Sequence, residues 1–174
     1  MKNTFRFIQF LALGTWVGSI IYFIAVVTRG AFAVLTRDEA GLLVGFTISG
    51  LHQLGEISAI LFIVAAVALE PSLKAFVRPA TIGVLIMFIL TLFSQHAVLP
   101  RIDALRRNMV SVDSTPLNDP RRAEFDRLHT ISVDLESAVL LLGFAALFLS
   151  ARAPRPNQIN EGIERAGRPL QGQK

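Results

Sequence analysis

Long apolar stretches alternate with short polar segments along this 174-residue chain. A helix rises about 1.5 Å per residue, so about 20 apolar residues are needed to cross the hydrocarbon core of a bilayer. The pattern predicts an all-α integral membrane protein, an antiparallel bundle of four transmembrane helices. The stretches that meet this length with few or no charges cover residues 7–27, about 42–69, 80–99 and about 131–149.

Polar and proline residues between the apolar stretches set the predicted helix boundaries. Thr36 and Glu39 fit a capping box at the start of the second helix, and Pro71 stops that helix. Asp119 followed by Pro120 is a typical start for the fourth. The last segment is rich in Pro, Gly, Gln and Arg, as disordered tails are. We therefore predict one membrane domain over residues 1–151, with helices at about 7–28, 37–70, 79–99 and 120–151, and a disordered polar tail over 152–174. A continuation of the third helix through the amphipathic residues 102–107 stays open.

Composition agrees with a membrane protein and excludes several function classes. The chain is 52% hydrophobic and 17% charged, with a mean hydropathy of +0.54. It contains no cysteine, which excludes disulfide scaffolds, thiolate metal sites and thiol catalysis. The pI of about 10.3 comes from arginines in membrane-flanking loops and in the tail, and no nucleic-acid-binding motif accompanies them. We expect the lipid bilayer as partner and no nucleic acid.

An even number of helices places both termini on one side of the membrane. Nine lysines and arginines lie on that side and eight on the other, so the positive-inside rule hardly separates the two orientations. We predict a multi-pass membrane protein with cytoplasmic termini. Gly14 and Gly18 allow close approach of another helix, and this face predicts a homo-oligomer.

Five ionisable side chains lie in or near the predicted helices, where such groups usually mark a site because burying them in hydrocarbon is costly. Counting along each helix from the side of the termini places the histidines at about 26 to 32 Å and the glutamates at about 21 to 22 Å. The predicted site therefore has imidazoles near its mouth and carboxylates deeper. Its candidate ligands are His52, Glu56, His96, His129 and Glu136.

Imidazole and carboxylate together suit a transition metal ion, namely iron, copper, zinc or manganese, while two facing histidines suit haem. A metal- or haem-binding membrane protein is thus the first hypothesis, although the chain lacks the Glu-x-x-His and His-Glu-x-x-His spacings of known sites. Ser132 lies one turn from His129 but occupies no nucleophile elbow. We therefore do not expect a hydrolase, and a redox enzyme would require haem or paired metal.

Two alternatives stay open. The polar residues could be interhelical hydrogen bonds of a structural or partner-binding subunit, for example Glu56 with Gln53 or Gln95. The chain could instead be a small oligomeric transporter in which Glu56 and Glu136 change protonation. A histidine near a helix end is often merely solvated, and both His96 and His129 lie near predicted helix ends. If the third helix turned His96 toward lipid, the site would shrink to His52, Glu56, His129 and Glu136.

Four segments carry a family pattern, namely Thr15-Trp-Val-Gly18, Leu51-His-Gln-Leu-Gly-Glu56, Leu99-Pro-Arg-Ile-Asp-Ala-Leu-Arg106 and Phe125-Asp-Arg-Leu-His-Thr-Ile-Ser132. They resemble the bacterial branch of the transmembrane-protein-205-like domain family. The resemblance covers roughly residues 7–150 and implies a four-helix domain of the bacterial inner membrane without an established activity in bacteria. Animal relatives are linked to the handling of platinum drugs, which points toward metals. The family pattern often has asparagine where this chain has Glu136, which implies a carboxylate added here. The first segment is also similar to the copper-resistance D-type membrane proteins.

Overall fold

The computed structural model describes residues 1–109, 111–116 and 118–152, and the predicted tail from residue 153 onward lies outside this part. All regular structure within the described residues is helical. In chain order, the elements are α1 (Lys2–Tyr22), the π-helical turn η1 (Phe23–Thr28), α2 (Arg29–Val34), α3 (Arg37–Leu69), the 3-10 helix η2 (Leu73–Ala75), α4 (Pro79–Phe93), the π-helical turn η3 (Ser94–Val98), α5 (Leu99–Arg107) and α6 (Pro120–Arg152).

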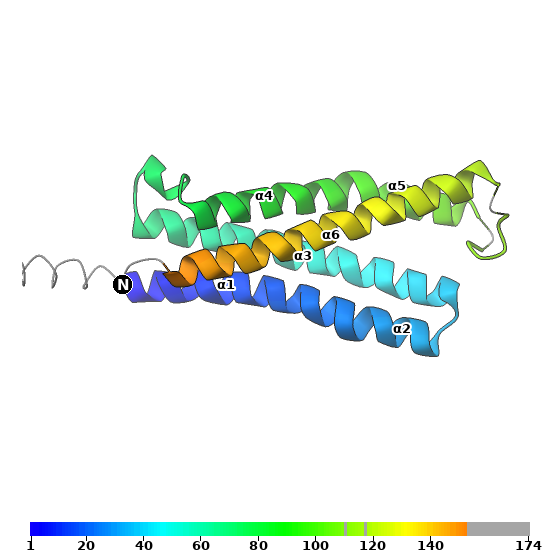
Figure 1. Cartoon of the computed structure of the whole chain (residues 1–174), viewed down its shortest axis with the longest axis horizontal. Helices are drawn as coiled ribbons and strands as arrows, with labels where there is room; N and C mark the ends of the chain where they lie inside the picture. Colours follow the sequence, from blue (N-terminus) through cyan, green and yellow to red (C-terminus); the bar gives the residue numbers. More distant parts are fainter. Residues whose placement is uncertain (110, 117, 153–174) are drawn as a thin grey trace, which may run out of the picture.

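These elements join into four long helical segments, which lie side by side along the long axis of the molecule (Figure 1). The segments Lys2–Val34, Arg37–Leu69 and Pro120–Arg152 have 33 residues each, and Pro79–Arg107 has 29. The most apolar windows of the four have mean hydropathies between 1.8 and 2.1. By length and composition all four can cross a membrane, which indicates a multi-pass membrane protein.

Two segments are longer than the sequence pattern predicts. The first begins at Lys2 and continues through Gly30 to Val34, beyond the predicted limits of 7 and 28. The third does not end at residue 99 but continues to Arg107. Pro100 lies in the first turn of α5, where its missing N–H breaks no hydrogen bond of that helix. The preceding π-helical turn η3 absorbs the irregularity, so the helical path passes the proline.

Local capping explains where two of the helices begin. The Thr36 hydroxyl accepts a hydrogen bond from the Glu39 N–H (3.4 Å), and the Glu39 carboxylate accepts one from the Thr36 N–H (3.0 Å). This capping box confirms the predicted start of α3. Before α6, Asp119 accepts a hydrogen bond from the Arg121 N–H at 2.8 Å. Hydrogen bonding to the Arg121 side chain and backbone lowers the pKa of the Asp119 carboxyl.

Small residues allow the segments to pack closely around the apolar core. α1 packs against α3 and α6, and α4 packs against α6 and α3. Trp16 is buried in this core, and a Cβ built on Gly55 would lie 2.6 Å from its Cε2 atom. A glycine is therefore required where α1 crosses α3. By contrast, many large apolar side chains elsewhere, such as Leu141, are exposed, as expected for a surface that faces lipid.

Candidate polar site in the helical core

The polar centre of the molecule is a contact between α3 and α6. His52 of α3 is 2% exposed and Glu136 of α6 is 8% exposed. The His52 Nε2 atom lies 3.2 Å from the Glu136 Oε2 atom, within hydrogen-bond distance. Two ionisable groups from separate helices therefore share one buried interaction, at positions that the sequence marked as candidates.

Gln95 of η3 extends this contact to a third segment. Its Oε1 atom lies 3.0 Å from the His52 Nδ1 atom, and its Nε2 group donates a hydrogen bond to the Ser49 hydroxyl at 2.9 Å. An amide oxygen can only accept, so His52 must donate through Nδ1–H. The result is a continuous row of hydrogen bonds through Ser49, Gln95, His52 and Glu136, which we call the polar row.

The π-helical turn η3 contains the residue of the third segment that reaches His52. In this turn the Leu99 N–H bonds to the Ser94 carbonyl, five residues back rather than four. Each residue inserted in this way rotates the following helix, here α5, by about 100° relative to a regular α-helix. Within the turn, Gln95 reaches the buried row and its neighbour His96 is exposed.

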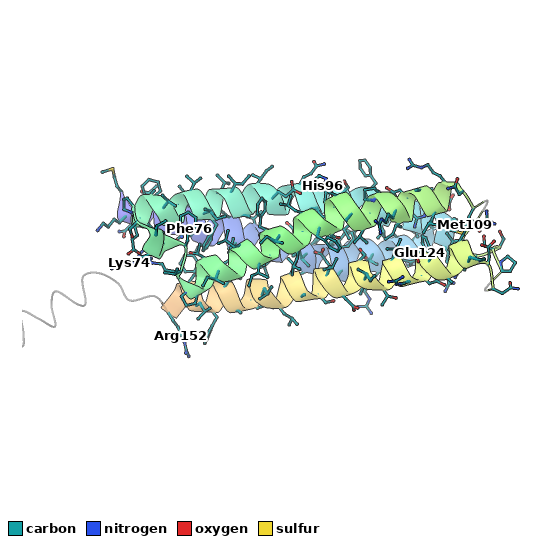
Figure 2. All side chains as sticks on the ribbon, turned by 90° about the horizontal axis from the view of Figure 1, so that it is seen from above. Lys74, Phe76, His96, Met109, Glu124 and Arg152 are labelled. Carbon is teal, nitrogen blue, oxygen red and sulfur yellow. The ribbon has the colours of Figure 1, made fainter. Side chains whose placement is uncertain are left out.

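Among the described residues, no hydrogen bond or ion pair joins the remaining candidate ligands to the His52–Glu136 contact. His96 and His129 are exposed, and the His129 ring stacks with Phe125 at 6.3 Å between centroids. Figure 2 shows His96 partway along the molecule, between the end with Met109 and Glu124 and the end with Lys74 and Arg152. Glu56 lies one turn beyond His52 on α3, and its Oε1 atom is buried without a hydrogen-bond partner among the described residues.

The five predicted ligands are thus not gathered around one point. Among the described residues, no group of three or more histidine, cysteine, aspartate or glutamate side chains is placed to hold a metal ion. The structure brings together His52 and Glu136, which supply one imidazole nitrogen and one carboxylate. Metal or haem binding remains a prediction.

A cavity of about 560 Å³ opens between the first half of α3, α5 and the segment that follows α5. Arg106 lines this cavity and donates a hydrogen bond to the Gly41 carbonyl at 2.7 Å. Asp38 accepts one from the Val112 N–H at 3.1 Å, which ties the loop to α3. The lining includes Asp38, Phe46, Ser49, Asp103, Arg106 and Arg107. Ser49 therefore belongs both to this cavity and to the polar row.

A model of a domain of unknown function, DUF4149, matches residues 11–111, which is more than half of the chain. The chain belongs to the DUF4149 family. The match includes Ser49, His52 and Gln95 and ends before α6, which carries Glu136. No curated protein and no solved structure matches this DUF4149 chain. The resemblance to the transmembrane-protein-205-like family is a finer assignment that these comparisons leave open.

Sequence reasoning identified the two acid–base partners of this DUF4149 chain but gave their neighbours other roles. Gln95 was considered only as a partner of Glu56, and Ser49 was not among the candidate residues. One available signal was the helical stripe of Ser49, His52 and Glu56, since positions three and four apart share a face. For Gln95 the only available signal was Pro100 five residues later, which warns of an irregular turn.

Proposed function

We propose that this DUF4149 chain crosses the membrane as an antiparallel four-helix bundle and that its His52–Glu136 pair exchanges protons in support of transport. The observation that carries the proposal is the buried contact between the two side chains, which come from different helices. Intramembrane histidine and carboxylate groups commonly form the proton relays of transporters.

The hydrogen bonds define how the pair holds its protons. Because Gln95 accepts from Nδ1–H, the His52–Glu136 contact needs one further proton between Nε2 and Oε2. That proton gives either a neutral imidazole with a carboxylic acid or an imidazolium with a carboxylate. Both forms keep the hydrogen bond, whereas removal of the proton leaves two acceptors facing each other. Gain or loss of a proton therefore changes the charge in the core and the strength of the side-chain contact that joins α3 to α6.

The test of this proposal is a direct measurement of proton binding by Glu136. Infrared difference spectra of the protein in lipid, recorded as the pH is stepped, report the carbonyl band of a protonated carboxyl group. We expect a pH-dependent band that disappears in the E136Q variant and shifts in the H52A variant. The matched control is E124Q, a substitution of a more exposed glutamate on the same helix. If the E136Q variant gave the same difference spectrum as the unsubstituted protein, the proposal would be refuted.

Metal binding is the second candidate function. Supporting observations are the imidazole and carboxylate of His52 and Glu136, which face each other, and the buried, unpartnered oxygen of Glu56 one turn away. The motif resemblance to the transmembrane-protein-205-like family points in the same direction. Elemental mass spectrometry of the purified protein and of an H52A/E136A variant tests this candidate. Stoichiometric metal that is lost in the variant supports it, and equal metal content in both proteins contradicts it.

Four helices are few to enclose a transport path, so transport would require several copies of the chain to associate. Gly14 and Gly18 are exposed on α1, and a Cβ at either position would meet no atom within 4 Å. This face is therefore open to a second copy of the chain, which supports the expected homo-oligomer. Leucine at both positions should abolish cross-linked oligomers in lipid while leaving unfolding unchanged. Unaltered cross-linking in the G14L/G18L variant would exclude this face.

A further inference from the structure

The 560 Å³ cavity provides space for water beside the polar row. A water molecule occupies about 30 Å³ in the liquid, so the cavity can hold a cluster of them. Its lining contains polar and charged groups that hydrogen-bond water, including Asp103, Arg107 and the Ser49 hydroxyl. It lies on the side of the loops that precede α3 and follow α5, at the end of the molecule marked by Met109 (Figure 2).

Two side chains of the polar row link this cavity to His52. Ser49 lines the cavity and accepts a hydrogen bond from Gln95 at 2.9 Å. Gln95 in turn lies 3.0 Å from the His52 Nδ1 atom. Gln95 is half-buried, whereas His52 is almost fully enclosed. Gln95 is thus the side chain that joins Nδ1 to the wall of the cavity.

We propose that this cavity is the aqueous vestibule through which protons reach and leave His52, and that the Gln95 side chain is its gate. The inference rests on the proposed proton exchange of the His52–Glu136 pair and assigns the route to it. The species that carries the proton through the vestibule is water, in the form of hydronium.

The chemistry of the gate follows from the atoms that face each other. While Gln95 accepts from Nδ1–H, that proton stays on the imidazole. When the Gln95 side chain turns away, a vestibule water takes its place. The imidazolium then releases the Nδ1 proton to this water, which becomes hydronium, and the remaining Nε2–H donates to the Glu136 carboxylate. Loading is the reverse step, so one N–H bond breaks or forms and the proton count balances.

The charges around this route include both signs. Asp38, Asp103, Arg106 and Arg107 line the vestibule, two acidic and two basic groups that leave it without a single strong sign to repel hydronium. At the pair itself, α6 presents the Glu136 carboxylate and η3 presents the uncharged Gln95. Glu56 is the other ionisable group of α3 near this level, one turn beyond His52.

The chain is well suited to a test of the route because it has no cysteine and only three histidines. Since His96 and His129 are exposed, an H96N/H129N background leaves His52 as the single histidine. In protein labelled with ¹⁵N-histidine, NMR then follows the exchange of the imidazole N–H protons with D₂O. The vestibule is blocked by attaching a bulky thiol reagent to an F46C variant at its exposed rim, and L42C is the second blocking variant. L43C is the matched control, since Leu43 is exposed on α3 but does not line the cavity.

Modification of the F46C or L42C variant should slow exchange of the Nδ1 proton at least tenfold, and modification of L43C should leave it unchanged. Substitution of the gate, Q95A, should accelerate the same exchange at least tenfold. Equal exchange rates before and after modification of both blocking variants would overturn the vestibule, and an unchanged rate in Q95A would overturn the gate. N–H exchange needs no net protonation change. A blocked exchange without a pH-dependent Glu136 band would therefore contradict the proposed function and leave the route standing.

Discussion

The His52–Glu136 contact should couple the two side chains energetically. We consider single and double alanine substitutions, H52A, E136A and H52A/E136A. Each single substitution leaves a buried polar partner without its hydrogen bond, which typically costs about 1–3 kcal/mol. The double substitution leaves neither partner behind, so it should be less destabilising than the sum of the single substitutions.

The size of the expected coupling free energy follows from the burial of the two side chains and from measured energies of interhelical hydrogen bonds. Interhelical hydrogen bonds in membrane proteins average about 0.6 kcal/mol and reach about 1.7. The two side chains here are almost fully enclosed, at 2% and 8% exposure, and one form of the pair is an ion pair. Charge-assisted hydrogen bonds are about twice as strong as neutral ones. We therefore expect a coupling of about 1–1.7 kcal/mol, in the upper part of the observed range.

Unfolding by sodium dodecyl sulfate in mixed micelles provides the assay. Trp16 is the only tryptophan and is buried in the core, so its fluorescence reports loss of packing. The control cycle uses Glu124 and Arg127, an exposed pair at 3.8 Å, for which we expect less than about 0.5 kcal/mol. If the destabilisation by H52A/E136A equalled the sum of the two single effects to within about 0.3 kcal/mol, the His52–Glu136 contact would not contribute to stability.

Two further predictions concern packing and pH. The G55A substitution should lower the free energy of unfolding by about 1–3 kcal/mol because its methyl group would overlap the Trp16 ring. The matched G50A variant, whose methyl group would lie in open space on the same helix, should be as stable as the unsubstituted protein or slightly more stable in the same assay. Because folding lowers the pKa of Asp119, its charged form stabilises the folded state, and this contribution is complete above the usual pKa near 3.8. The contribution is lost as the pH falls through the lowered pKa that Asp119 has in the folded protein. The D119N variant should therefore show faster amide hydrogen exchange at the start of α6 at neutral pH and match the unsubstituted protein in strong acid. Equal exchange at neutral pH would contradict this cap.

The sequence alone predicted the features that local interactions determine. Four apolar stretches of sufficient length predict four helices, since a backbone in hydrocarbon must satisfy its own hydrogen bonds. The start of α3 followed from the capping box of Thr36 and Glu39, in which both partners lie within one turn. The predicted end of the first helix near residue 28 was wrong, because glycine acts as a breaker only where packing does not continue the helix. The third segment follows the alternative in which the helix continues past Pro100 to Arg107.

Only the tertiary structure decided which polar side chains meet. In a soluble helix, the contrast between apolar and polar faces shows which side is buried. In a membrane helix both the lipid-facing and the core-facing sides are apolar, so the sequence does not fix the rotation about the helix axis. Counting depth therefore placed His96 near His52, but the rotation of the third segment about its axis brought Gln95, within η3, there instead. Glu136 did reach His52, because α6, which packs against α1 and α4, turns this side chain into the core, and this contact defines the buried polar centre of the protein.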